Sequence, residues 1–80
     1  MNSELLDLYV KVLKNEMSAL REKKAITNTR PIGQLTFWLV GLLDNGFTQE
    51  DIADVDKEYR KKAYEIIEKE NPGLIKNLFN

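Results

Sequence analysis

The chain of 80 residues contains no cysteine and no histidine. Without cysteine there is no disulfide, no thiolate nucleophile and no sulfur-ligated metal. Without histidine, the usual general base and the commonest ligand of transition metals are also missing. Zinc centres and histidine-dependent catalytic triads are therefore excluded. We expect no enzymatic activity, no catalytic residue, no bound metal and no cofactor.

Glycine, proline and excess charge are also scarce. The four glycines are dispersed, so no glycine-rich loop is present to cradle a phosphate. Lysine and arginine number 12 against 13 acidic residues, a net charge of -1, which argues against a dominant polyanion-binding role. The acidic residues between Glu50 and Asp56 lack the spacing of a calcium loop, and we expect them to lie near a helix N-terminus.

No apolar run is long enough to cross a membrane. The most apolar stretch, residues 31–43, is shorter than the roughly 20 residues that a spanning helix needs, and it contains glycine, glutamine and threonine. The first residues lack the basic region and cleavage site of a signal peptide. These features predict one soluble domain, residues 1–80, in the cytoplasm, with no membrane partner and no small-molecule substrate indicated.

The remaining pattern is helical throughout. It predicts an all-α fold, a compact antiparallel bundle of three main helices over about 3–26, 31–44 and 49–70, with a short C-terminal helix over about 72–79. Asn2 or Ser3 is suited to cap the first helix, and Pro31 to begin the second. Asn45-Gly46 is typical of a helix end, and residues 48–51 of a capping box at the next start.

The width of each apolar face predicts how the helices pack. The face of helix 3–26 covers roughly 200°, so it should contact two neighbours, or one neighbour and a second subunit. Helix 31–44 has an equally wide face, which predicts that it is the central, mostly buried helix. The stripe of helix 49–70 is about 120° wide and continues in phase across residues 54–56. This continuity favours one helix, although Asp56 could cap a break there. The last helix offers Leu74, Ile75, Leu78 and Phe79 for packing.

Helix 31–44 carries a candidate interaction site on its less apolar arc. Phe37 lies there, with Gly33 one turn before it and Gly41 one turn after it. Glycine inside a helix costs about 1 kcal/mol relative to alanine, so two of them call for a packing explanation. The notch that they form with Phe37 could be filled by another helix of the same chain, which is the commoner arrangement. A dimer or a protein partner could fill it instead.

Glu16 is a second candidate, because it falls within the apolar face of helix 3–26. It either lies at the divide between two packing seams and reaches solvent, or is buried with a partner such as Arg30, Lys23 or a tyrosine hydroxyl. In the second case it could act as a recognition acid.

A basic cluster gives an alternative function. Lys57, Arg60, Lys61 and Lys62 follow a Thr-Gln-x-x-Ile-Ala pattern similar to the first helix of a helix-turn-helix reader. A turn at residues 54–56 would make 57–69 a recognition helix for DNA or RNA. A solvated face with alternating ion pairs is the other interpretation, and intervening glutamates favour it.

The leading hypothesis is a non-enzymatic protein–protein interaction module: a homodimer, an adaptor or an inhibitor-type regulator. It predicts a concentration-dependent dimer or exposed side chains at Phe37, Leu5 and Leu8. In size and composition the chain also resembles the small helical, Lys- and Glu-rich proteins common among phage, plasmid and bacteriocin-immunity genes. That similarity implies an immunity-type or phage- or plasmid-encoded binding protein as a further alternative.

Overall fold

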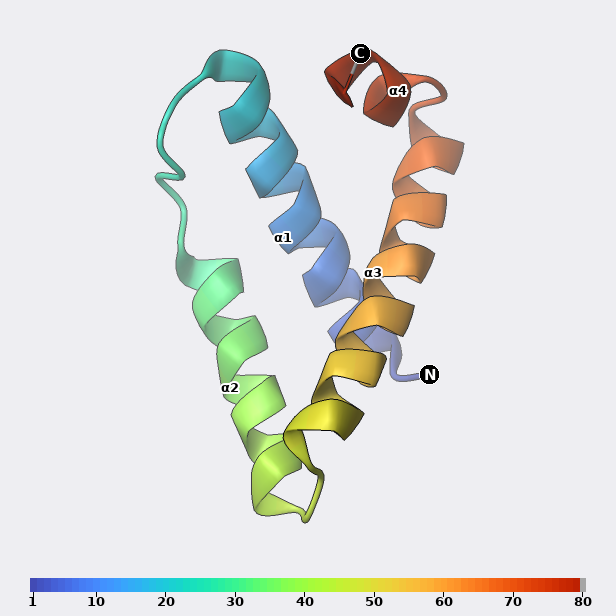
Figure 1. Cartoon of the computed structure of the whole chain (residues 1–80). Helices are drawn as coiled ribbons and strands as arrows, with labels where there is room; N and C mark the ends of the chain where they lie inside the picture. Colours follow the sequence, from blue (N-terminus) through green and yellow to red (C-terminus); the bar gives the residue numbers. More distant parts are fainter. Residues whose placement is uncertain (80) are drawn as a thin grey trace.

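The structure, a computed structural model, describes the backbone of residues 1–79 and the side chains of residues 1–77. Within that range the chain forms helices and no strand (Figure 1): α1 (Ser3–Glu22), α2 (Arg30–Asp44), α3 (Gln49–Glu70) and α4 (Leu74–Phe79). The predicted all-α class, with three main helices and a short fourth, is confirmed. The side chains predicted to pack from Leu78 and Phe79 lie outside the described residues.

The helix boundaries follow local hydrogen bonds that the sequence signals. The Asn2 side chain caps α1 by accepting a hydrogen bond from the Leu5 amide at 3.1 Å. Thr48 and Asp51 form a reciprocal capping box at the start of α3. After α2, the Phe47 amide donates to the Leu42 carbonyl across Gly46, whose φ of 90° is left-handed. This is the expected Schellman ending.

Three boundaries differ from the prediction. Helix α1 ends at Glu22 rather than near residue 26, because Lys23 takes the left-handed conformation at φ 54° and closes the helix. Helix α2 begins at Arg30, one residue early. Helix α4 begins at Leu74 rather than at residue 72, because Gly73 before it has a left-handed φ of 84°. Helix α3 is continuous through residues 54–56, so the break that Asp56 could have capped does not occur.

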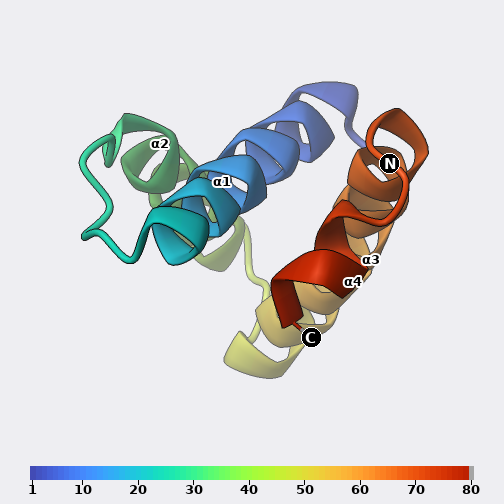
Figure 2. The ribbon, with the colours of Figure 1, turned by 90° about the horizontal axis from the view of Figure 1, so that it is seen from above.

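Helix α1, not α2, is the centre of the bundle. It lies between α2 and α3 in two perpendicular views (Figures 1 and 2), and it contacts α2, α3 and α4. Six of the ten buried apolar residues come from α1, and α2 contributes one, Leu35. The core within the described chain is Leu5, Leu8, Tyr9, Val12, Leu13 and Met17 of α1, Leu35 of α2, and Tyr59, Ala63 and Ile67 of α3.

The predicted central position of helix 31–44 is therefore wrong, and the reason lies in α3. A 120° apolar stripe can cover one neighbour. Helix α1 takes that stripe, packing against Tyr59, Ala63 and Ile67. Helix α2 is left with α1 on one side and meets α3 only near the loop that joins them (Figure 1).

The overall shape agrees with this arrangement. The radius of gyration is 13.5 Å, and the molecule measures 39 × 25 × 20 Å. A closely packed domain of this length would have a radius of gyration of about 12 Å. The bundle is elongated, with one flank of α2 uncovered by the rest of the described chain.

Candidate functional site: the exposed face of helix α2

Large apolar side chains are exposed over a wide arc of α2 centred near Phe37. We call this arc the α2 face; its members are Gly33, Phe37, Trp38, Val40, Gly41 and Leu43. Phe37 is the most exposed of them, with 80% of its surface accessible. Trp38, Val40 and Leu43 belong to the wide apolar face from which a mostly buried helix 31–44 is predicted, and they are exposed as well. Sequence reasoning missed them because their arc is apolar enough to be a core.

The notch around Phe37 is open. A Cβ atom built on Gly33 or Gly41 would meet no other atom within 4 Å, apart from its own helix and neighbouring residues. No helix of the described chain therefore packs against the glycines. Of the two explanations, filling from within the chain is excluded for residues 1–77.

Two hollows flank the aromatic pair Phe37 and Trp38. The larger, of about 560 Å³, lies between α1 and α2 and has Gly33 in its lining. The smaller, of about 380 Å³, contains Gly41 and extends along α2 to Asn45. Phe37 and Trp38 line both hollows, so they form an aromatic ridge with a glycine-lined depression on each side.

The α2 face is also free of charge. No charged residue occurs between Pro31 and Leu43, and the charges of the helix stand at its two ends, Arg30 and Asp44. Neither residue belongs to an ion pair recorded among the described residues. Exposed patches of this kind mark interaction sites more often than they mark ordinary surface. Charge enters the larger hollow from α1, through Glu4, Asp7 and Lys11.

Leu5 and Leu8, the other apolar candidates, are not on this surface. Their exposed fractions are 3% and 6%, and both belong to the core. The prediction that Leu5 and Leu8 are exposed is therefore wrong, because α2 and α3 together cover the wide apolar face of α1. Leu8 still reaches the larger hollow as part of its lining.

Glu16 is half-buried and forms no ion pair with the described residues. Its carboxylate is near Arg60. Burial of the Arg60 guanidinium opposes its charge, but the hydrogen bond to Asp56 and the carboxylates of Asp56 and Glu16 raise its pKa above the ordinary value. Glu16 is thus neither fully buried nor fully exposed. None of its proposed partners holds it as an ion pair.

The four basic candidates of α3 do not form one patch. Arg60 donates a hydrogen bond to Asp56 at 3.0 Å, and Lys62 pairs with Glu65 at 3.6 Å. Lys57 and Lys61 line a broad, shallow hollow in which Glu65 and Glu68 also lie. The turn that a helix-turn-helix reader needs is absent from α3, which is one helix over its whole length.

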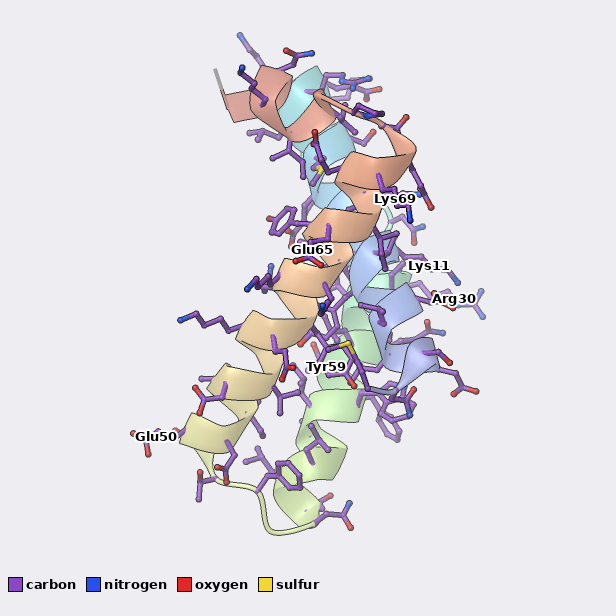
Figure 3. All side chains as sticks on the ribbon, turned by 90° about the vertical axis from the view of Figure 1, so that its right-hand side faces the viewer. Lys11, Arg30, Glu50, Tyr59, Glu65 and Lys69 are labelled. Atoms are coloured by element: carbon purple, nitrogen blue, oxygen red, sulfur yellow. The ribbon has the colours of Figure 1, made fainter. Side chains whose placement is uncertain are left out.

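A polar network joins α1 to α3 beside the core. The Tyr9 hydroxyl donates to Asp56 at 2.7 Å, and the Asn2 amide donates to the Tyr59 hydroxyl at 2.8 Å. The two tyrosine rings stack with centroids 5.4 Å apart, and Figure 3 shows Tyr59 between the two helices. Burial and the hydrogen bond to Asp56 raise the pKa of Tyr9, so its hydroxyl stays protonated near neutral pH. The network therefore joins α1 to α3 through hydrogen bonds and ring stacking.

Comparisons with protein-family models, with curated protein sequences and with solved structures returned no match. The functional interpretation consequently depends on the geometry alone. Over the part of the chain that the structure describes, no helix combines the length and the apolarity needed to span a membrane. In the same range, no three acidic side chains converge as a group of metal ligands.

Proposed function

We propose that this chain is a non-enzymatic protein–protein interaction module that binds a helical partner on the α2 face. The observation that carries the proposal is the exposure of Phe37 on a charge-free helical surface, with open space where the two neighbouring glycines would carry a side chain. An aromatic side chain held between hollows is the kind of anchor that dominates binding energy in protein interfaces. A partner helix could place its own side chains in the depressions over Gly33 and Gly41.

The fold supports this function by keeping the face rigid and available. Leu35 is buried and Ile32 and Leu39 pack against the core, so one side of α2 is anchored to α1. The opposite side is thereby held outward along the length of the helix. Interfaces built on rigid elements lose less conformational entropy on binding than interfaces built on loops.

A site-specific crosslink tests the proposal. Phe37 would be replaced by a diazirine analogue of phenylalanine in the cells that make the protein. Leu20, an exposed apolar residue near the end of α1, provides the matched control position. We expect a discrete protein adduct from position 37 and none from position 20.

The adduct should also depend on the shape of the notch. Adding Gly41→Leu fills the smaller hollow, and open space around that glycine means that the fold accommodates the new side chain. Loss of the adduct in this variant would support binding on the α2 face. Equal labelling from positions 37 and 20, or an adduct unaffected by Gly41→Leu, would contradict the proposal.

A further inference from the structure

The α2 face has a symmetry that a single chain does not require. Arg30 and Asp44 lie seven residues before and after Phe37, and Gly33 and Gly41 lie four residues before and after it. Seven residues are close to two turns of an α-helix, so the two charges share the side on which Phe37 lies. The two glycines and the two charges are therefore spaced symmetrically about Phe37, with opposite charges at the helix ends.

The two end charges, Arg30 and Asp44, interact unfavourably with the dipole of their own helix. A helix N-terminus carries partial positive charge and favours acids, whereas a C-terminus favours bases. In α2 the first turn has Arg30 and no acid, and the last turn has Asp44 and no base. Arg30 extends away from the bundle in Figure 3. Stability of the isolated helix therefore does not account for either charge.

Both charges are accounted for by an antiparallel copy of the same helix. We infer that the partner on the α2 face is a second copy of this chain, docked through α2 against α2 with a two-fold axis at Phe37. Arg30 then lies beside Asp44 and the C-terminal end of the other α2, and Asp44 lies beside Arg30 and the N-terminal end. Each charge meets an opposite charge and the favourable end of a helix dipole.

The packing surfaces are self-complementary in the same register. Gly33 of one copy lies across from Gly41 of the other, and neither position presents a side chain that would obstruct the contact. The two Phe37 side chains then lie beside each other at the two-fold axis. A two-fold interface needs this property, because one surface must serve as both partners. The inference rests on the proposed function and names its partner.

Sedimentation equilibrium of the purified chain, with Phe37→Glu and Leu20→Glu as a matched pair, tests self-association. We expect the natural chain to dimerise with a dissociation constant on the order of micromolar, typical of a small interface. Phe37→Glu should raise that constant at least ~30-fold, because the residue lies on the axis and is altered in both copies. Leu20→Glu should leave it unchanged, and circular dichroism should show both variants folded, since both positions are exposed.

A charge-exchange experiment tests the orientation. Arg30→Asp places like charges opposite each other twice per dimer and should weaken association about tenfold at low salt. Adding Asp44→Arg should restore it in an antiparallel dimer. In a parallel dimer each of these positions faces its own copy, so the double variant would restore nothing. Both substitutions suit the α2 dipole better than the natural residues, so unfolding would not explain a loss.

The outcomes separate this inference from the function on which it rests. Dimerisation that Phe37→Glu abolishes and the charge exchange restores would support the antiparallel pair. A chain that stays monomeric at millimolar concentration, a dimer indifferent to Phe37→Glu, or an unrestored double variant would overturn it. If the monomeric chain still forms the position-37 adduct with a different protein, the second copy is refuted and the interaction module stands.

Discussion

The α1–α3 interface and the α2 face are both rich in apolar side chains, which are buried in the first and exposed in the second. Between α1 and α3, apolar side chains are buried, the two tyrosine rings stack and the polar groups at the edge are hydrogen-bonded. On α2, the most apolar helix of the chain, Leu35 is buried while Phe37, Val40 and Leu43 face outward. Hydrophobic content alone therefore does not decide which helix becomes the core.

Which helix becomes the core is decided by how many neighbouring helices have an apolar face that can cover it. Helix α3 offers one narrow stripe, and its residues Tyr59, Ala63 and Ile67 are buried in one core cluster with residues of α1. Once that stripe is used, α2 packs along α1 and meets α3 only near the loop that joins them. Its second side is left for something outside the described chain, which is why the functional proposals concern α2.

The sharpest test of this contrast compares truncation in the two regions. Leu13→Ala in the core should lower the free energy of unfolding by about 2–5 kcal/mol, because it leaves a cavity at a fully enclosed position. Phe37→Ala should change it by no more than about 0.5 kcal/mol in the monomer, because the ring is exposed. Urea unfolding at a concentration too low for association measures both. Similar losses for the two variants would mean that the α2 face is covered.

The next largest effect should come from the hydrogen bond between Tyr9 and Asp56 beside the core. Tyr9→Phe removes the hydrogen bond to Asp56 and should cost about 1–2 kcal/mol near neutral pH. The same bond gives a pH dependence. Because the pKa of Tyr9 is raised by folding, its contribution is complete below the ordinary tyrosine pKa of about 10 and is lost as the pH rises toward the higher folded value.

Stability should therefore decline above about pH 10 in the natural chain and less steeply in Tyr9→Phe. Unfolding by urea at several alkaline pH values measures the difference. Tyr64→Phe is the control, since no hydrogen bond from the Tyr64 hydroxyl is recorded among the described residues. A decline of the same steepness in the natural chain and in Tyr9→Phe would contradict the assignment to Tyr9.

Substitutions at Gly33 and Gly41 should stabilise the monomer, unlike the substitutions in the core. Gly33→Ala and Gly41→Ala should each raise the free energy of unfolding of the monomer by about 1 kcal/mol, because alanine favours the helix and meets no neighbour. Gly46→Ala is the matched control, and it should destabilise the chain by a similar amount, since its φ of 90° strains any side chain. Destabilisation by Gly33→Ala or Gly41→Ala in the monomer would show that the notch is occupied.

The smallest effect lies at the start of α3, in the capping box of Thr48 and Asp51. Hydrogen bonds from the Thr48 amide and hydroxyl lower the pKa of Asp51. A carboxylate with a lowered folded pKa stabilises the fold above its ordinary pKa of about 4, and this contribution is lost as the pH falls through the folded value. Acid unfolding curves of the natural chain and Asp51→Asn should converge at low pH. Parallel curves down to the lowest pH would refute the role of the capping box.

Much of the fold is readable from local signals. Asn2, Thr48 with Asp51, and Asn45 with Gly46 are side chains or backbones suited to a specific helix end, and each acts there. The end of α1 could not be read in this way. Lys23 adopts a left-handed conformation that glycine usually supplies. A lysine at that position gives no sequence signal that the helix ends there.

The candidate site was predicted in part. Phe37 between Gly33 and Gly41 stood out because glycine and an exposed aromatic are both unusual inside a helix. Trp38, Val40 and Leu43 did not stand out, since a helical wheel shows how apolar an arc is and not whether a neighbour covers it. That question depends on how three helices share their faces, which is a property of the assembled bundle.

The long-range contacts between α1 and α3 also constrain how the chain can acquire its structure during synthesis. The hydrogen bonds of Tyr9 to Asp56 and of Lys14 to Glu70 each join residues that are far apart in the chain. More than half of the chain must therefore be synthesised before either contact can form. Until then α1 has only α2 to lie against. Helix α2, whose apolar side chains are exposed in the folded molecule, is thus the first helix that can cover the apolar face of α1. This order follows from the position of α2 directly after α1 in the chain.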